Sequence, residues 1–271
     1  MEKAERELSV NLPSWAEASA CERVKLCFLN LAIMLPILLI ISFVSISCFV
    51  YMYFYVRPLM VYVKDPPALY FYHSEEEFQL AYAKGWVCGT SLTVLILLFV
   101  WSYFQAIRTC PGFVEKGRDE EPLIVGNKSE KRFCDKCDLL KPERAHHCQQ
   151  CESCILLMDH HCNWLANCVG LMNYKFFMLT LFYACLALLL YSGTFWECAG
   201  IYIASEDTST YTAFVMVLVY TLVIALSLVL VPFFGFHVWK MGKNITTIEY
   251  IEKKTKASKF DKGWVLSLIH I

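Results

Sequence analysis

The sequence predicts an all-α membrane protein with four transmembrane helices and a cytosolic, cysteine-rich domain between the second and the third. Two observations on the whole chain support this fold class. Hydrophobic residues make up 57% of the 271 residues and charged residues only 18%, which is too apolar for an ordinary soluble domain. Four long apolar stretches alternate with polar segments, and most basic residues lie in alternate polar segments.

The first half of the chain contains two of these apolar stretches. Residues 1–25 are polar and carry both signs of charge, so we expect a cytosolic N-terminal segment without a signal peptide. No acidic or basic residue occurs from Leu26 to Val56, which is longer than the roughly 20 residues that cross a bilayer. A polar link, residues 57–85, precedes a second span from about Trp86 to Ile107. We therefore assign residues 26–107 to helices 1 and 2 with a lumenal link.

The second half of the chain contains the other two apolar stretches, which follow a long polar insert. Residues 108–175 form the predicted cytosolic cysteine-rich domain. A third span runs from about Phe176 to Trp196, and a fourth from about Tyr211 to Trp239, which places helices 3 and 4 within residues 176–239. Residues 240–271 form a basic C-terminal segment. We see no internal repeat in the sequence.

The distribution of Lys and Arg predicts the orientation. Four precede the first span, ten lie between Arg108 and Lys175, and seven follow Trp239, against three in the first link and none in the second. Cytosolic loops carry the excess of basic residues in membrane proteins. Both termini and the cysteine-rich domain are therefore expected in the cytosol, in an endomembrane (Golgi or endoplasmic reticulum) or the plasma membrane.

A dense Cys/His stretch runs from Cys134 to Cys168. It holds seven of the 14 cysteines and four of the seven histidines. In a reducing compartment, paired C-x2-C motifs with nearby His favour metal binding over disulfides. Two closed zinc sites of three Cys and one His need six Cys and two His. The stretch therefore predicts two structural zinc ions and leaves one Cys and two His over.

The surplus residues fall beside a carboxylate. His160 and Cys162 lie with Asp159 in one tetrapeptide. An isolated surplus residue is most simply a packing residue, but a carboxylate that orients an imidazole, and an imidazole that takes a thiol proton, together activate a cysteine nucleophile. The group therefore indicates a catalytic site supported by metal.

Asp159-His160-His161-Cys162, in a cytosolic loop between the second and third of four spans, resembles the DHHC family of protein S-acyltransferases, or palmitoyltransferases. The resemblance extends to the segments 141–148, 167–170 and 173–177, and to Thr246-Thr247-Ile248-Glu249, which matches the TTxE motif of the family. Motifs and topology together cover most of residues 26–250. The resemblance is therefore highly specific.

The resemblance implies a role for each residue of the Cys/His stretch. One zinc site is implied for Cys134, Cys137, His147 and Cys154. A second is implied for Cys148, Cys151, His161 and Cys168. Cys162 is then the nucleophile, His160 its base, and Asp159 the group that orients His160. His146 keeps no ligand role.

The resemblance also implies the reaction. The Cys162 thiolate attacks the thioester of a long-chain acyl-CoA, palmitoyl-CoA above all, and a cysteine of a substrate protein then takes the acyl group. The expected partners are acyl-CoA, the lipid bilayer and proteins with membrane-proximal cysteines, with no nucleic acid. Cations must hold the CoA phosphates, and the candidates are Lys131, Arg132, Lys141, Arg144 and Lys175.

Two other function classes are weaker. A zinc-supported membrane adaptor would bind partners through the cytosolic domain, but it has no need of the surplus thiol and base. A channel or carrier would be expected to place charged residues inside the spans, and the four predicted spans contain none.

Overall fold

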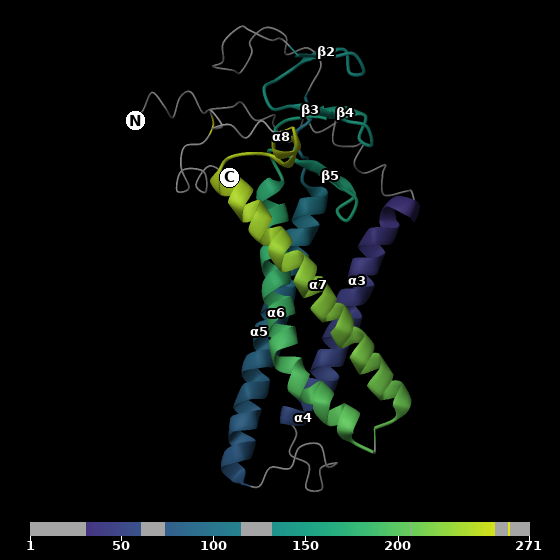
Figure 1. Ribbon diagram of the computed structural model, residues 1–271, viewed down its shortest axis with the longest axis vertical. Helices are drawn as coiled ribbons and strands as arrows, with labels where there is room; N and C mark the ends of the chain where they lie inside the picture. Colours follow the sequence, from purple (N-terminus) through teal and green to yellow (C-terminus); the bar gives the residue numbers. More distant parts are fainter. Residues whose placement is uncertain (1–30, 61–73, 115–131, 207, 253–259, 261–271) are drawn as a thin grey trace, which may run out of the picture. The chain divides into compact units, whose positions relative to one another are not determined.

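The computed structural model describes residues 31–60, 74–114, 132–206, 208–252 and 260 (Figure 1). The chain divides into two compact units. The first comprises Met1–Ile37, Phe104–Phe177 and Lys240–Ile271, and the second comprises Leu38–Tyr103 and Met178–Trp239. Each unit is therefore assembled from segments that are far apart in the sequence.

Long helices account for most of the described residues. Helix α3 spans Leu31–Tyr51 and continues through a π-helical turn, η2, at Met52–Val56 into α4 at Arg57–Met60. The other long helices are α5 at Glu75–Arg108, α6 at Tyr174–Ala204 and α7 at Thr210–Gly242. All four helical stretches are long and apolar enough to cross a membrane. The predicted fold class is confirmed, while the expected start of the first span at Leu26 lies outside the described residues.

The second span begins earlier than the sequence suggested. Helix α5 starts at Glu75, eleven residues before Trp86. The Ser74 hydroxyl accepts a hydrogen bond from the backbone N–H of Glu77 at 3.2 Å, as a helix-capping residue does. The three glutamates of the first turn lie at the positive end of the helix dipole. Residues that look too polar for a bilayer are therefore the first turns of the same helix.

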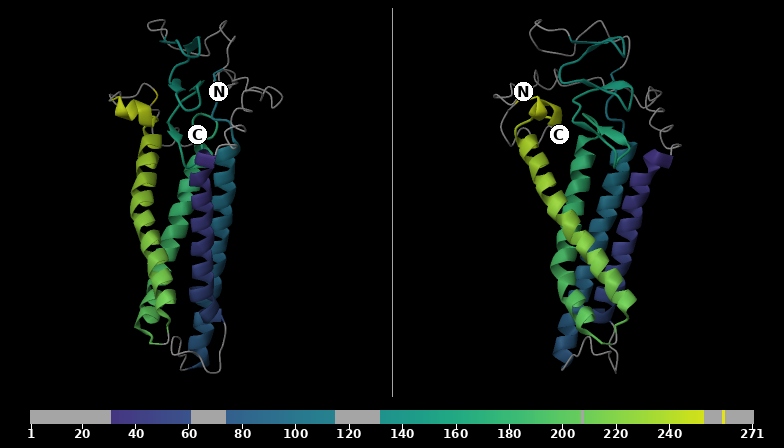
Figure 2. Two further views of the ribbon diagram at one scale, coloured as in Figure 1. Left: turned by 90° about the vertical axis from the view of Figure 1, so that its right-hand side faces the viewer. Right: turned by 45° about the vertical axis from the view of Figure 1, so that its right-hand side comes forward.

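The second unit is a bundle that contains most of each long helix, without the first residues of α3 and α6 and the last residues of α5 and α7 (Figures 1 and 2). Tyr51 of α3 and Thr194 of α6 share a hydrogen bond of 2.7 Å, and the Tyr220 hydroxyl of α7 donates to a carbonyl of α6 at 3.1 Å. A Cβ added at Gly85 of α5 would lie 3.0 Å from the Leu59 side chain. Small residues and buried hydroxyl pairs are the usual contacts between membrane helices.

Three two-stranded antiparallel hairpins form the Cys/His stretch in the first unit. Strand β1 (Arg132–Cys134) pairs with β2 (Leu139–Lys141), β3 (His146–Cys148) with β4 (Ser153–Ile155), and β5 (His160–Cys162) with β6 (Asn167–Val169). Each strand has only three residues. Because isolated two-stranded hairpins are marginally stable at best, these need further support.

Two asparagines join the third hairpin to the end of α5 within the first unit. The Asn167 amide donates to the carbonyls of Ile107 and Thr109, both at 3.1 Å. The Asn173 amide donates to the Cys168 carbonyl at 2.8 Å, and its oxygen accepts from the backbone N–H of Gly170 at 2.9 Å. The last carbonyls of a helix lack partners within the helix. Asn167 therefore fastens the hairpin that carries Cys162 to the C-terminal end of α5.

Candidate active site and metal centres

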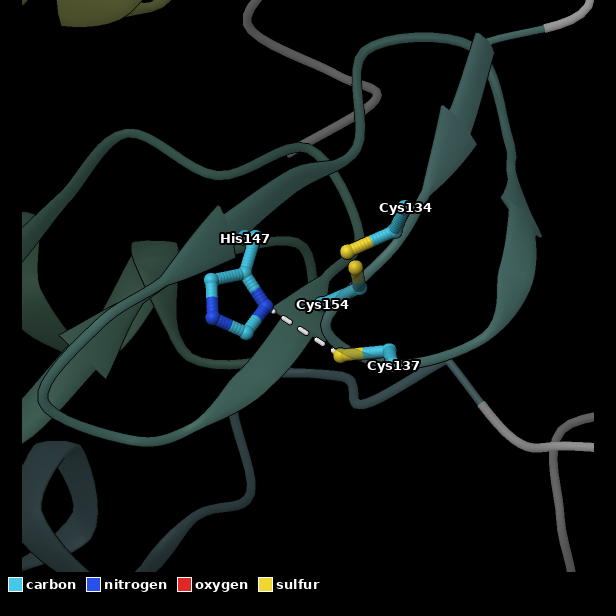
Figure 3. Close-up of side chains that lie close together, drawn as sticks. All are labelled: Cys134, Cys137, His147 and Cys154. Atoms are coloured by element: carbon cyan, nitrogen blue, oxygen red, sulfur yellow. Dashed lines mark hydrogen bonds between the residues drawn. The ribbon is translucent and has the colours of Figure 1, made fainter.

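The first candidate metal centre joins the first two hairpins (Figure 3). Its ligand atoms belong to Cys134, Cys137, His147 and Cys154 and lie within 4.8 Å of one another. Cys134 ends β1 and Cys137 lies in the following turn, while His147 and Cys154 are directly paired across β3 and β4. Nδ1 of His147 lies 3.1 Å from Sγ of Cys137. The first hairpin thus contributes a turn and the second a cross-strand pair.

The second candidate centre joins the second and third hairpins in the same way. Its ligand atoms belong to Cys148, Cys151, His161 and Cys168 and also lie within 4.8 Å of one another. His161 and Cys168 are paired across β5 and β6. Nδ1 of His161 lies 3.5, 3.4 and 3.5 Å from the sulfurs of Cys148, Cys151 and Cys168.

The spacing of these atoms fits zinc. Zn–S bonds of about 2.3 Å and Zn–N bonds of about 2.0 Å in a tetrahedron place sulfur and nitrogen roughly 3.5 Å apart. The sulfur–nitrogen distances of 3.4 to 3.5 Å in the second centre match this value. Three thiols and one imidazole are also a usual donor set of a closed structural zinc site. The structure therefore brings together both four-residue sets named from the sequence.

Strand β5 separates the metal ligand from the candidate catalytic groups. Successive side chains of a strand point to opposite faces, so His160 and Cys162 share one face and His161 points to the other. Cys162 is partly exposed. The imidazole of His160 hydrogen-bonds through Nδ1 to Oδ2 of Asp159 at 2.8 Å and packs edge-on against Phe177 at 5.3 Å between ring centres. The structure thus groups the three residues that the sequence singled out.

The electrostatics of this group favour charged side chains. Burial alone would lower the pKa of His160, but hydrogen bonds with Asp159 and Cys162, and the charges of these two groups, raise it to about 9. Burial alone would raise the pKa of Asp159, but the hydrogen bond with His160 and the charge of Lys240 hold it well below its usual range. At neutral pH, Asp159 is therefore a carboxylate and His160 an imidazolium beside the sulfur of Cys162.

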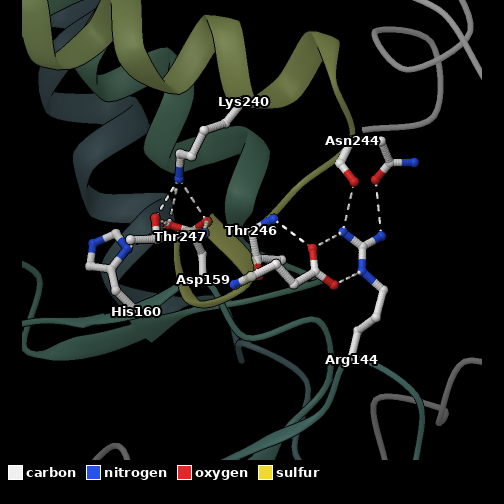
Figure 4. A network of polar contacts seen from close by, with 8 residues as sticks. Arg144, Asp159, His160, Lys240, Asn244, Thr246 and Thr247 are labelled. Carbon is white, nitrogen blue, oxygen red and sulfur yellow. Dashed lines mark hydrogen bonds and ion pairs between the residues drawn. The ribbon is translucent and has the colours of Figure 1, made fainter. Parts of the chain in front are cut away.

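Lys240 and Thr247 complete the surroundings of Asp159 (Figure 4). The sequence indicated Thr247 only as part of the TTxE motif, without a partner, and did not indicate Lys240. The Lys240 ammonium donates to Oδ1 and Oδ2 of Asp159 at 2.9 and 3.2 Å and also contacts the Thr247 hydroxyl. Thr247 donates its backbone N–H to Oδ1 at 2.8 Å and its hydroxyl to Oδ2 at 2.7 Å. Lys240 is fully buried although it follows an apolar span.

The TTxE motif forms the start of helix α8, Thr247–Ile251. Thr246 accepts from the backbone N–H of Glu249, and the Glu249 carboxylate accepts from the backbone N–H of Thr246 at 2.8 Å. This reciprocal capping box is what a T-x-x-E sequence predicts at the beginning of a helix. The first Thr and the Glu therefore hold the backbone in the turn that presents the second Thr to Asp159.

Arg144, which lies just before the second hairpin, also binds the carboxylate of Glu249. Its guanidinium donates to both oxygens of Glu249 at 2.7 and 2.8 Å and to the side-chain and main-chain oxygens of Asn244 at 3.0 and 2.9 Å (Figure 4). It also lies 4.6 Å from the centre of the Phe260 ring. Burial alone would raise the pKa of Glu249, but hydrogen bonds from Arg144 and Thr246 lower it. Arg144 thus ties the C-terminal segment to the cysteine-rich domain.

The other candidate cations are more dispersed. Lys141 lies in β2 and lines, with Lys136 and His147, a cavity of about 290 Å³ beside the first metal centre. Arg132 lies in β1 and donates to the carbonyl of Pro142 at 3.1 Å. Lys175 lies in the first turn of α6, over the ring of Phe176. Lys131 lies outside the described residues, and CoA binding by any of these residues stays a prediction.

Comparison with known proteins gives one consistent result. The model of the family described as DHHC palmitoyltransferase matches residues 127–254. The chain is 33% identical over 190 residues to human "Palmitoyltransferase ZDHHC20", covering 60% of this chain and 52% of that protein. It is 36% identical over 208 residues to "Probable protein S-acyltransferase 14" of Arabidopsis thaliana, covering 64% of this chain and 66% of that protein.

A third relative, "Palmitoyltransferase ZDHHC20-A" of Danio rerio, is 39% identical over 118 residues, which cover 44% of this chain and 33% of that protein. The chain thus spans between a third and two thirds of the length of these relatives. The matched region contains both candidate metal centres, the Asp159–Cys162 tetrapeptide and the TTxE motif. Over residues 127–254, the chain carries the domain of the DHHC palmitoyltransferase family.

Proposed function

We propose that this protein is a membrane-bound protein S-acyltransferase. It moves a long-chain acyl group, palmitoyl above all, from acyl-CoA to Cys162 and then to cysteine thiols of substrate proteins. The observation that carries the proposal is the cluster of Cys162, His160 and Asp159 beside two metal-ligand sets, in a chain with four membrane-capable helices. The names of its relatives agree with this reaction.

The first half-reaction forms an acyl-enzyme. The sulfur of Cys162, which shares a hydrogen bond with His160, is the nucleophile, and cysteine attacks in its thiolate form. The thiolate attacks the thioester carbonyl, the C–S bond to CoA breaks, and the CoA thiolate leaves, with His160 placed to supply its proton. Asp159 fixes the Nδ1 side of the ring, so Nε2 is the nitrogen that exchanges protons.

The second half-reaction reverses these roles. The thiol of a substrate protein loses its proton to His160 and attacks the acyl-enzyme, and Cys162 leaves as a thiolate. One thioester replaces another, so the reaction needs little driving force and depends on thiolate activation and positioning. Burial of a long acyl chain contributes about 0.8 kcal/mol per methylene, which makes a membrane location the natural one for Cys162.

Zinc at the two Cys/His centres would be structural. Four protein ligands close each centre, so bound zinc would hold hairpins together and supply folding free energy. The third hairpin would be held by His161 and Cys168, on the strands that also carry Cys162. We further propose that residues 108–175 and both termini face the cytosol. CoA phosphate binding is proposed for the cations Lys131, Arg132, Lys141, Arg144 and Lys175.

Acyl-CoA labelling of the purified protein tests the proposal. Detergent-solubilised protein given palmitoyl-CoA should acquire an acyl group that hydroxylamine removes. Cys162→Ser should abolish this group and keep two zinc ions per chain, whereas Cys48→Ser in α3 should leave labelling intact. Acylation that persists in a zinc-replete Cys162→Ser protein would refute the nucleophile assignment.

A further inference from the structure

The three hairpins repeat with a period of 14 residues, contrary to the sequence interpretation, which found no repeat. Their first cysteines are Cys134, Cys148 and Cys162, each 14 positions after the last. The cross-strand pairs follow the same period, at Cys134↔Leu139, Cys148↔Ser153 and Cys162↔Asn167. The sequence His-His-Cys also recurs 14 residues apart, at 146–148 and 160–162, and the strand register shows that these matches belong to equivalent hairpins.

The turns of the hairpins repeat as well. The fourth residue after each first cysteine has a positive φ, which is 53° at Asp138, 50° at Glu152 and 49° at Ala166. Positive φ is uncommon for residues other than glycine. Its recurrence at three equivalent positions shows that the three turns share a backbone bend, although the third contains no second cysteine.

Each metal centre uses two successive hairpins. It takes the two turn cysteines from one hairpin and the cross-strand His and Cys from the next. The first hairpin has Phe133 and Leu140 where the others carry the His–Cys pair, and it supplies only turn ligands. The third supplies only its pair, His161 and Cys168, because α6 begins at Tyr174 and leaves no room for a fourth hairpin.

The turn of the third hairpin therefore has a cysteine at only one of the two positions that bind metal in the other two turns. Cys162 occupies the position of the ligands Cys134 and Cys148, whereas Leu165 occupies the position of the second ligands, Cys137 and Cys151. The Leu165 side chain is only 3% exposed. Its backbone N–H donates to the carbonyl of Cys162 at 3.1 Å, which holds position 165 against Cys162.

We propose that Leu165 is a specificity-determining residue that keeps the Cys162 thiol free of metal. A ligand at position 165 would face the sulfur of Cys162, as Cys151 faces Cys148 in the second turn. His160, which hydrogen-bonds to Cys162, would supply a third donor on releasing its proton to water, as metal binding requires of a ligand. Two sulfurs and one imidazole are enough to hold zinc with an open fourth position. The thiolate would then be a metal ligand, with its lone pair no longer available for attack.

This inference rests on the proposed function, in which the free thiol of Cys162 accepts the acyl group. Its test does not depend on acyl transfer. Alkylation by iodoacetamide, followed at the Cys162 peptide by mass spectrometry, reports whether the sulfur is free. The inference and the acyltransferase assignment can therefore fail separately.

The variants are Leu165→Cys and Leu165→His, each of which restores a ligand, with Leu165→Met as the control of similar volume. Full-length protein in detergent is kept reduced, and alkylation is timed with and without added Zn²⁺. At a zinc concentration about ten times the dissociation constant, the free thiol falls about tenfold. Zinc should therefore slow Cys162 alkylation about tenfold in a ligand variant, reversibly on brief chelation, and leave wild type and Leu165→Met unchanged.

Three outcomes would overturn the proposal. The first is alkylation in both ligand variants that zinc does not slow, although both retain the two resident zinc ions. The second is equal slowing in wild type and Leu165→Met, because position 165 would then not decide metal binding. The third is loss of the resident ions in both ligand variants but not in Leu165→Met, because the position would then accept no ligand. Selective protection in either ligand variant supports the proposal.

Discussion

The ammonium of Lys240, at the end of α7, lies 2.9 Å from Oδ1 of Asp159, the residue that precedes β5. The two residues are 81 positions apart, and both are buried. A buried carboxylate without a compensating charge is costly. Lys240 therefore allows Asp159 to remain ionised where it holds His160.

Replacement of Lys240 by Met should slow acylation of Cys162. The substitution removes charge-assisted hydrogen bonds worth about 1.5–3 kcal/mol, which corresponds to a loss of about ten- to a hundredfold if the positioning of His160 depends on them. The rate of hydroxylamine-sensitive labelling measures the effect, and zinc content checks the fold. Lys243→Met, at an exposed position three residues later, is the control. Equal rates in both variants would contradict a role for Lys240.

Glu249→Gln should destabilise the protein at neutral pH, by about 3–5 kcal/mol if the buried pair with Arg144 behaves as other broken pairs do. The side chains of Arg144 and Glu249 are 11% and 13% exposed. Because the folded state lowers the pKa of Glu249, its contribution is present above the unfolded pKa near 4.5 and is lost as the pH falls through the folded value. The difference in thermal unfolding midpoint between wild type and variant should therefore shrink on acidification. A difference that is constant with pH would contradict this ion pair.

Gly170→Ala should destabilise the folded protein, because the added Cβ would clash with neighbouring atoms. A Cβ at Gly170 would lie 2.6 Å from the carbonyl oxygen of Pro111 and 2.8 Å from Ile155. Overpacking of this kind costs about 1–3 kcal/mol. Gly200→Ala is a matched control, since a Cβ there would meet nothing within 4 Å. Thermal unfolding of both variants in the same detergent should show a lower midpoint for Gly170→Ala alone.

The two metal centres should differ in their effect on Cys162. Cys134→Ala removes a ligand of the centre between the first and second hairpins, and Cys151→Ala one of the centre that holds the third. Each variant should lose one zinc, because structural zinc binding is coupled to local folding. Acyl labelling of Cys162 should fall further in Cys151→Ala, whose lost ion would have held His161 and Cys168. Equal labelling in the two variants would argue that the hairpins fold as one unit.

Much of this architecture could be predicted from the sequence because its determinants are local. Apolar runs indicate the membrane helices, and C-x2-C pairs indicate turns that bind metal. The spacing of Thr246 and Glu249 by itself predicts a capping box. The pairing of turn cysteines with a cross-strand His and Cys, by contrast, depends on strand register. Three-residue strands give no pattern long enough to reveal that register.

The partners of Asp159 and Arg144 could not be predicted, because long-range contacts decide them. Lys240 follows an apolar span and reads as an ordinary interfacial cation, while Glu249 contacts Arg144 across 105 positions. The early start of α5 was missed for a related reason. Its glutamates are polar by composition, yet helix capping at Ser74 extends the helix to them.

The filled hydrogen-bond capacity of Asp159 limits where protons can move. A carboxylate has about four acceptor sites, and those of Asp159 are taken by Lys240, by the backbone and hydroxyl of Thr247, and by His160. With its low pKa, this carboxylate does not take up a proton at neutral pH. Asp159 therefore holds the His160 ring without exchanging protons, and the proton-transferring side of that ring reaches water, since the His160 side chain is 26% exposed. In the proposed reaction, the imidazole of His160 would therefore move protons while the carboxylate that orients it stays unchanged.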